Sequence, residues 1–203
     1  MLSREDNPVV SCACDSLFAR LYDGSGQELF KFINQGKPKK EGAMAISVGD
    51  RIPTSTLHKM GASSPEPIQS EELFSGRKVV LFALPGAFTP TCSAKHLPGF
   101  IELAGEFGDK GIDEIVCLSV NDVWVMNAWG QAQGAADKVS MIADGNGAFT
   151  RGMGRQADLS AAGFGERSGR YAMIVDDAVV THLNIEEPRK FEVSDAATML
   201  ALL

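Results

Sequence analysis

The sequence predicts an α/β fold in which a central mixed sheet is flanked by helices. Continuous apolar runs, typical of strands buried on both faces, alternate with segments whose apolar residues recur at helical spacing. That alternation indicates parallel strands joined by helices that cover the sheet. Nearer the C-terminus, two strand-like runs follow each other directly, which adds antiparallel pairing.

The clearest strand and helix come in sequence. The strand is predicted over residues 78–84, which read Lys-Val-Val-Leu-Phe-Ala-Leu, and Pro85-Gly86 ends it. Thr89-Pro90 opens a helix, because threonine is a good N-cap and proline suits the first helical position. The helix is expected to end within 108–111. Its apolar residues at helical spacing are Leu97, Phe100, Ile101, Ala104 and Phe107.

The next strand and helix repeat this pattern. A second buried strand is predicted over 114–120. Asn121-Asp122 can cap a helix that runs to about Gln133. Its inward residues are expected to be Val125, Met126 and Trp129.

The remaining elements complete the sheet. A third strand is predicted over 139–143, and residues 170–175 and 178–183 are expected to form a hairpin. Ser194 is expected to cap a final helix that runs through Leu203. Together these elements are typical of a thioredoxin-like α/β fold.

Residues 1–43 differ from the rest and are expected to be a poorly ordered N-terminal extension of unclear role. They contain several glycines, the run Lys37-Pro38-Lys39-Lys40 and only a weak helical pattern over 17–33. Met44 is a plausible start for the folded domain, which would then cover 44–203. The sequence leaves open whether residues 1–43 are a natural extension, an added segment or an upstream mis-start.

Composition excludes several classes of protein. The chain has 203 residues with 44% hydrophobic content, enough for one sizeable core. The net charge of −7 offers no excess of lysine and arginine for a nucleic acid. No apolar run approaches the ~20 residues that a membrane-spanning helix needs.

The N-terminus also bears on location. The first thirty residues lack the basic and apolar regions of a secretory signal and carry five acidic residues, which transit peptides usually avoid. A cytoplasmic protein is therefore expected.

The four cysteines are too few and too scattered for a disulfide scaffold. Cys12 and Cys14 have the wrong spacing for a zinc knuckle, and no histidine or cysteine pair nearby completes a site. We therefore expect no metal and no cofactor. In a reducing compartment the expectation is free thiols.

Cys92 is the strongest functional candidate. If Thr89 is the N-cap, Cys92 lies in the first turn of a helix that follows a buried strand. Free backbone N–H groups and the positive end of the helix dipole both stabilise a thiolate relative to a thiol there. The alternative is an inert cysteine packed under the helix, but the strand–turn–helix context and Thr89 one turn earlier favour a reactive thiol.

The segment around Cys92, together with several later segments, resembles a known family. The segment Pro-Gly-Ala-Phe-Thr-Pro-Thr-Cys-Ser over 85–93 is similar to the active-site signature of the peroxiredoxins. The segments over 96–100, 117–122 and 126–129 resemble the peroxiredoxin-five and plant type II subgroup. Arg-Tyr-Ala-Met-Ile-Val over 170–175 resembles the strand that bears the family's arginine. The resemblance covers about Val48 to Leu200.

The resemblance implies a thiol peroxidase that reduces hydrogen peroxide and small alkyl hydroperoxides. Cys92 would be the nucleophile and become a sulfenic acid, and Arg170 would hold the thiolate and the peroxide. Thr89 would orient the O–O bond, and Pro85 would shield the sulfur from water. Backbone N–H groups over 86–92, including those of Gly86 and Thr91, would bind the peroxide oxygens.

The sulfenic acid must then be reduced by another thiol. Cys117 lies in a predicted buried strand, so an inert thiol is favoured, and a resolving role stays as the alternative. The family's other resolving position, near the C-terminus, has no cysteine here, and Cys12 or Cys14 would have to reach the site from the extension. A one-cysteine cycle is therefore expected, with glutathione and glutaredoxin or else thioredoxin as reductant. The resemblance also implies a homodimer.

Two other functions compete. A thiol–disulfide oxidoreductase would place a second cysteine three residues from Cys92, but residues 89 and 95 are threonine and lysine. A redox sensor or chaperone would pass oxidation from Cys92 to a client protein, and turnover with a generic reductant separates it from a peroxidase. His96, one turn after Cys92, is expected to pack or hydrogen-bond at the helix surface.

Overall fold

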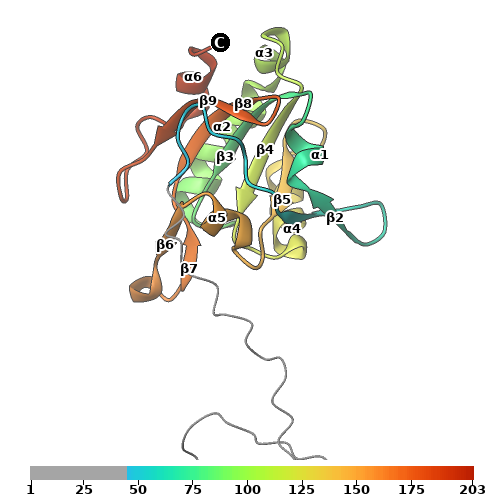
Figure 1. Ribbon diagram of the computed structural model, residues 1–203. Coiled ribbons are helices and arrows are strands. Elements are labelled where there is room, and N and C mark those ends of the chain that lie inside the picture. Colours follow the sequence, from blue (N-terminus) through green and yellow to red (C-terminus); the bar gives the residue numbers. More distant parts are fainter. Residues whose placement is uncertain (1–44) are drawn as a thin grey trace, which may run out of the picture. The chain divides into compact units, whose positions relative to one another are not determined.

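A computed structural model describes residues 45–203, so the expectations for residues 1–43 and for the boundary at Met44 lie outside the described part or at its edge. Its main feature is a seven-stranded sheet with the strand order β2-β1-β5-β4-β3-β8-β9 (Figure 1). A separate two-stranded sheet pairs β6 with β7. The strands are β1 Thr56–Met60, β2 Pro65–Gln69, β3 Lys78–Ala83, β4 Glu114–Ser119, β5 Ser140–Ala143, β6 Gln156–Asp158, β7 Glu166–Ser168, β8 Tyr171–Asp176 and β9 Val179–Ile185.

The sheet is mixed, as the sequence predicts. The centre is parallel, because β3 pairs with β4 and β4 with β5 in the same direction. Strands β8 and β9 form the antiparallel hairpin beside β3. At the other edge, β1 runs antiparallel to both β2 and β5.

Helices cover both faces of the sheet. The described α-helices are α1 Ser70–Phe74, α2 Leu97–Glu102, α3 Ala104–Asp109, α4 Val123–Gln133, α5 Ala148–Gly152 and α6 Ala196–Leu200. A π-helical turn, η1 Cys92–His96, and a 3₁₀ helix, η2 Ser160–Ala162, are also present. One core lies between the sheet and the buried residues of α2, α3, α4 and α6. The other lies under α1 and α5 (Figure 1).

Strand β3 shows why its sequence is continuously apolar. Val80 and Phe82 belong to the first core, whereas Val79 and Leu81 belong to the second. Because successive side chains of a strand point to opposite faces, a strand covered on both sides must be apolar at every position. All four of these side chains are fully buried.

The structure corrects several local predictions. Ser194 is not the cap of the last helix: Asp195 is, because its side chain accepts from the N–H of Thr198, and α6 ends at Leu200. The long helix predicted after Thr89 is divided, with α2 and α3 meeting at Leu103, whose ψ of 9° departs from helical geometry. The short elements β1, β2, α1, α5, β6 and β7 had no prediction.

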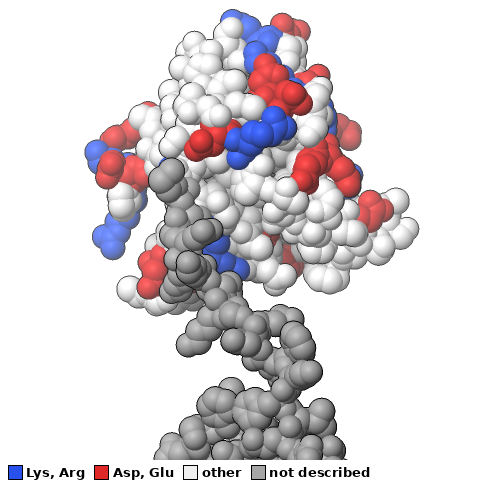
Figure 2. Space-filling model, viewed as in Figure 1, with Lys and Arg blue, Asp and Glu red and all other residues white. Residues whose placement is uncertain are grey.

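The surface carries charges of both signs. Figure 2 shows lysine and arginine lying among aspartate and glutamate on the visible face. Within residues 45–203, no helix has the length and apolar character needed to cross a membrane.

Candidate active site

The candidate site begins where β3 ends. In the helix that follows, the first hydrogen bond runs from the N–H of Ser93 to the carbonyl of Thr89 at 3.0 Å, so the backbone of Thr89 starts the helix as predicted. The hydroxyl of Thr89 acts differently from a capping side chain. It donates to the carbonyl of Gly86 at 2.8 Å and closes the loop between strand and helix.

A second strand end fixes this loop. Asn121 follows β4, and its Oδ1 accepts from the N–H of Ala87 at 3.0 Å and from the Ser119 hydroxyl at 2.8 Å. The loop turns sharply at Phe88, whose φ of 61° is unusual for a residue other than glycine. The Phe88 side chain is 57% exposed. The loop is thus held at two points, by the Thr89 hydroxyl on Gly86 and by Asn121 on Ala87.

The helix opens with a π-helical turn over Cys92–His96. The N–H of Leu97 donates to the carbonyl of Cys92, five residues earlier, which defines this wider turn. Cys92 and His96 are both fully buried, so they face inward together. Such π-turns occur frequently at functional sites.

Arg170 meets both of these residues. It lies between β7 and β8, and because Tyr171 pairs with Ala83, the start of β8 lies beside the end of β3. Arg170 Nη2 donates to Cys92 Sγ at 3.4 Å, and Nη1 lies 2.9 Å from His96 Nδ1. The structure therefore brings together two residues that are 78 positions apart in the chain.

His96 is the residue that sequence reasoning missed. The sequence predicts that it packs or hydrogen-bonds at the helix surface, but it is fully buried and packs against the stacked rings of Phe82 and Phe100. Burial, and then the charge of Arg170, lower the pKa of His96 to about 3. Its imidazole is therefore neutral at physiological pH. Its position four residues after Cys92, on the same helix face, was the available signal.

The other predicted site residues surround this group. Gly86 is buried, and Pro85 and Thr91 are half-buried. A Cβ at Gly86 would make ordinary van der Waals contact with Cγ2 of Thr89, at 3.4 Å. Thr91 is in the first helical turn, directly before Cys92.

Cys117 sits in the middle of β4 and is fully buried. Burial, and the nearby Cys92, raise the pKa of the Cys117 thiol well above its ordinary value. That environment suits an inert thiol, because the thiolate is the reactive form. Cys12 and Cys14 lie outside the described residues.

The site can therefore carry out nucleophilic chemistry on a small molecule. A guanidinium stays protonated at all ordinary pH values and places a fixed positive charge beside the sulfur. The same charge can stabilise negative charge that develops on a reacting group nearby. The sulfur is fully buried, which restricts its partners to small ones unless the helix start moves. In residues 45–203, no three metal-ligating side chains are grouped in a way that could hold an ion.

Comparison with known proteins gives a consistent result. The family described as Redoxin matches residues 47–200. Peroxiredoxin-2E, chloroplastic, of Arabidopsis thaliana is 49% identical over 163 residues, covering 78% of this chain and 70% of its own length. Peroxiredoxin-2B of the same plant is 46% identical over 159 residues, covering 78% of this chain and 98% of its own length.

A solved structure also resembles this chain. It is the reduced Prx3 of Vibrio vulnificus in complex with hydrogen peroxide, at 50% identity and a TM-score of 0.75. The match covers 77% of this chain and 98% of the Vibrio chain.

Proposed function

Because this chain belongs to the peroxiredoxins, in the type II/Prx5 subgroup, and is a thiol-dependent peroxidase that reduces peroxides, we propose that Cys92 is its peroxidatic thiol. The observation that carries this proposal is the contact of 3.4 Å from Arg170 Nη2 to Cys92 Sγ at a fully buried position. The other described cysteine, Cys117, has no such donor within residues 45–203, and its raised pKa favours the protonated thiol.

The proposed reaction is a displacement at oxygen. The thiolate of Cys92 attacks one peroxide oxygen, the O–O bond breaks, and the second oxygen takes a proton and leaves as water or an alcohol. The sulfur becomes a sulfenic acid, two electrons more oxidised, while the peroxide is reduced. Arg170 stabilises the negative charge that spreads from sulfur to both oxygens.

The surrounding loop supplies orientation in this scheme. The Thr89 hydroxyl, which now donates to Gly86, would turn to the peroxide and align its O–O bond with the sulfur. Pro85 would keep bulk water from the sulfur. Backbone N–H groups near Gly86 and Thr91 would bind the peroxide oxygens. The burial of Cys92 favours hydrogen peroxide and small alkyl hydroperoxides as substrates.

The cycle closes with an external thiol in this proposal. Burial of Cys117 in β4 favours an inert role for it, so glutathione with glutaredoxin, or thioredoxin, would reduce the sulfenic acid of Cys92. A resolving role for Cys117, Cys12 or Cys14 is the alternative. The one-cysteine cycle and a cycle with an internal resolving cysteine predict different behaviour of these thiols, so an experiment can separate them.

The test combines turnover with mass spectrometry. Peroxide consumption is measured for the full chain with each reductant, and for Cys92→Ser and Cys117→Ser. The proposal expects no turnover without Cys92 and full turnover without Cys117. After one equivalent of peroxide, the added oxygen should lie on Cys92 with no intramolecular disulfide. Turnover by Cys92→Ser would refute the proposed nucleophile, and loss of turnover in Cys117→Ser would refute the one-cysteine cycle.

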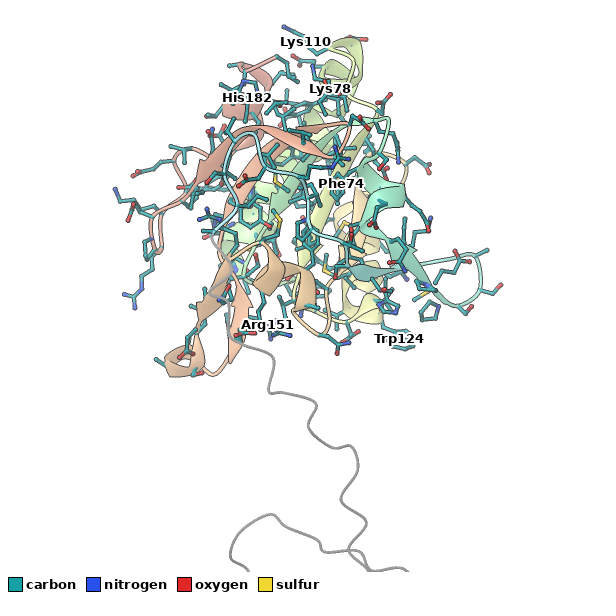
Figure 3. All side chains as sticks on the ribbon, in the orientation of Figure 1. Phe74, Lys78, Lys110, Trp124, Arg151 and His182 are labelled. Atoms are coloured by element: carbon teal, nitrogen blue, oxygen red, sulfur yellow. The ribbon has the colours of Figure 1, made fainter. Side chains whose placement is uncertain are left out.

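A homodimer that packs near the active site is also proposed. Phe88 is 57% exposed in the active-site loop, and Trp124 on α4 is 64% exposed and projects from the domain (Figure 3). The Phe88 ring lies 6.5 Å from the ring of Trp129, also on α4, so the loop and this helix adjoin. Sedimentation should show a dimer that Phe88→Ser weakens and that the control Phe164→Ser leaves intact. A monomeric wild type would contradict it.

A cytoplasmic location is the last part of the proposal. The acidic residues among the first thirty support it, whereas the chloroplastic relative of Arabidopsis favours plastid import as the alternative. Fluorescent fusions of the full chain and of the chain from Met44 would decide. Import of only the full-length fusion into an organelle would overturn the cytoplasmic proposal.

A further inference from the structure

The hydrogen bonds of His96 have a definite direction. Arg170 Nη1 lies 2.9 Å from His96 Nδ1, and a guanidinium only donates, so Nδ1 must accept. The proton of the neutral ring is therefore on Nε2, which donates to the carbonyl of Ser194 at 3.0 Å. One backbone carbonyl thus fixes the tautomer that can hold Arg170.

That carbonyl belongs to a loop organised by one carboxylate. The loop covers residues 186–195. Glu186 Oε1 accepts from the backbone N–H groups of Glu192, Val193 and Ser194, each at 2.8 Å, and from the Ser194 hydroxyl at 2.9 Å. Burial opposes ionisation of Glu186, but these N–H donors outweigh it and hold its pKa below the ordinary value. The charged form of Glu186 therefore holds these hydrogen bonds of the loop at neutral pH.

The same loop touches the arginine in two further ways. The N–H of Glu186 donates to the carbonyl of Arg170 at 3.0 Å. The Phe191 ring lies 5.6 Å from Arg170 Cζ and 5.0 Å from the His96 ring. Phe191 and His96 thus contact the guanidinium, while the N–H of Glu186 holds the backbone of the same arginine.

Arg170 needs such support because its side chain has several rotatable bonds. A single contact to Cys92 would leave the guanidinium plane free to turn about that contact. The second contact, to His96, fixes the plane and aims the Nη2 donor at the sulfur. Preorganised donors stabilise a transition state without having to reorient during the reaction.

We propose that the loop of residues 186–195 aims Arg170 at Cys92 through His96, which makes His96 and Glu186 positioning residues of the peroxide-reducing site. The inference rests on the proposed role of Cys92. It extends the site from the signature segment to the C-terminal loop.

A purely structural role for His96 makes a different prediction. His96 packs against Phe82 and Phe100, at ring distances of 4.9 and 5.7 Å. If packing were its only role, leucine would replace it better than glutamine, because an uncharged amide in an apolar site costs more to bury. If positioning is its role, glutamine is the better substitute, since its amide can accept from Arg170 and donate to Ser194.

The experiment measures the rate at which hydrogen peroxide oxidises Cys92 in a single turnover of the reduced full-length protein. We expect His96→Leu to lower the second-order rate constant by about 10-fold to 100-fold, as misplaced catalytic groups do. His96→Gln should recover most of that loss. Circular dichroism and urea unfolding verify that each variant is folded.

A second pair of variants tests the loop itself. Glu186→Ala removes the four hydrogen bonds that hold the loop and should slow Cys92 oxidation by about 10-fold. Glu187→Ala, at an exposed neighbour, is the matched control and should match the wild-type rate. If His96→Leu does not fold, this pair decides alone.

The possible results distinguish failure of the positioning role from failure of the proposed function of Cys92. The positioning role is overturned if folded His96→Leu reacts at the wild-type rate. It is also overturned if His96→Leu reacts faster than His96→Gln. Equal rates for Glu186→Ala and Glu187→Ala overturn the role of the loop. Failure of wild-type Cys92 to react with peroxide would instead contradict the proposed function.

Discussion

Replacing His96 should change how the stability of the protein depends on pH. The unfolded chain binds a proton at His96 with a pKa of about 6.5. In the folded protein burial and Arg170 lower that pKa to about 3. Between these values the unfolded state binds more protons, so the free energy of unfolding must fall as the pH falls.

The size of the effect follows from the two pKa values. Going from about pH 7.5 to about pH 5, the unfolded chain gains almost one proton at this site and the folded protein almost none, which lowers the free energy of unfolding by about 2 kcal/mol. Glu186 and Asp195 also face His96, and their charges partly oppose the lowering of its pKa. Subtracting the pH dependence of a variant from that of wild type cancels the contributions of titrating groups that both proteins share.

The assay is urea unfolding at a series of pH values for wild type, His96→Gln and His96→Leu. Both variants lack the titrating ring, so both should lose about 2 kcal/mol less than wild type over that interval. Their absolute stabilities differ, but the comparison uses only the change with pH. Parallel curves for all three proteins would show that folded His96 takes up a proton over this interval as the unfolded chain does, which would contradict a neutral imidazole at pH 5.

Four further substitutions test the fold around the site. Asp122→Ala removes the side-chain cap of α4 and should lower the free energy of urea unfolding by about 1 kcal/mol, whereas no loss would mean that the cap is replaced by water. Gly154→Ala and Gly163→Ala both place a side chain at positive φ, at a cost of about 1–2 kcal/mol. Only at Gly154 would the new Cβ approach a backbone atom, at 2.7 Å, so its thermal unfolding midpoint should fall further, and equal midpoints would contradict that packing. Tyr171→Phe removes a buried hydroxyl that has no hydrogen-bond partner within the described residues, so stability should not fall, and a loss above about 1 kcal/mol would reveal a partner such as bound water.

The sequence predicts the central elements well because their signals are local. Strand β3 is a continuous apolar run, and α4 has an aspartate cap followed by helical periodicity. The strands β1 and β2 are five residues each with mixed burial, so their period-2 signal is weak. Short helices such as α1 give too few turns for a periodic pattern.

The site residues that could be predicted are likewise those with a local signal in the sequence. Cys92 and Thr89 could be predicted because strand, turn and helix start are adjacent in the chain. Arg170 came from a resemblance, since nothing local relates it to a cysteine 78 residues away. Glu186 had no signal at all, because its donors are backbone N–H groups that the loop brings together only in three dimensions.

The most direct test of the account compares two arginines. The single-turnover rate constant for oxidation of Cys92 by hydrogen peroxide is measured in wild type, Arg170→Gln and Arg151→Gln. Arg151 (Figure 3) is a half-exposed surface residue, and it pairs with Glu166. Its loss should leave the rate within about twofold, because surface ion pairs contribute little. Loss of the donor that contacts Cys92 should slow oxidation by about 100-fold or more. Oxidation of Arg170→Gln at the wild-type rate would contradict the central claim that this guanidinium activates the sulfur.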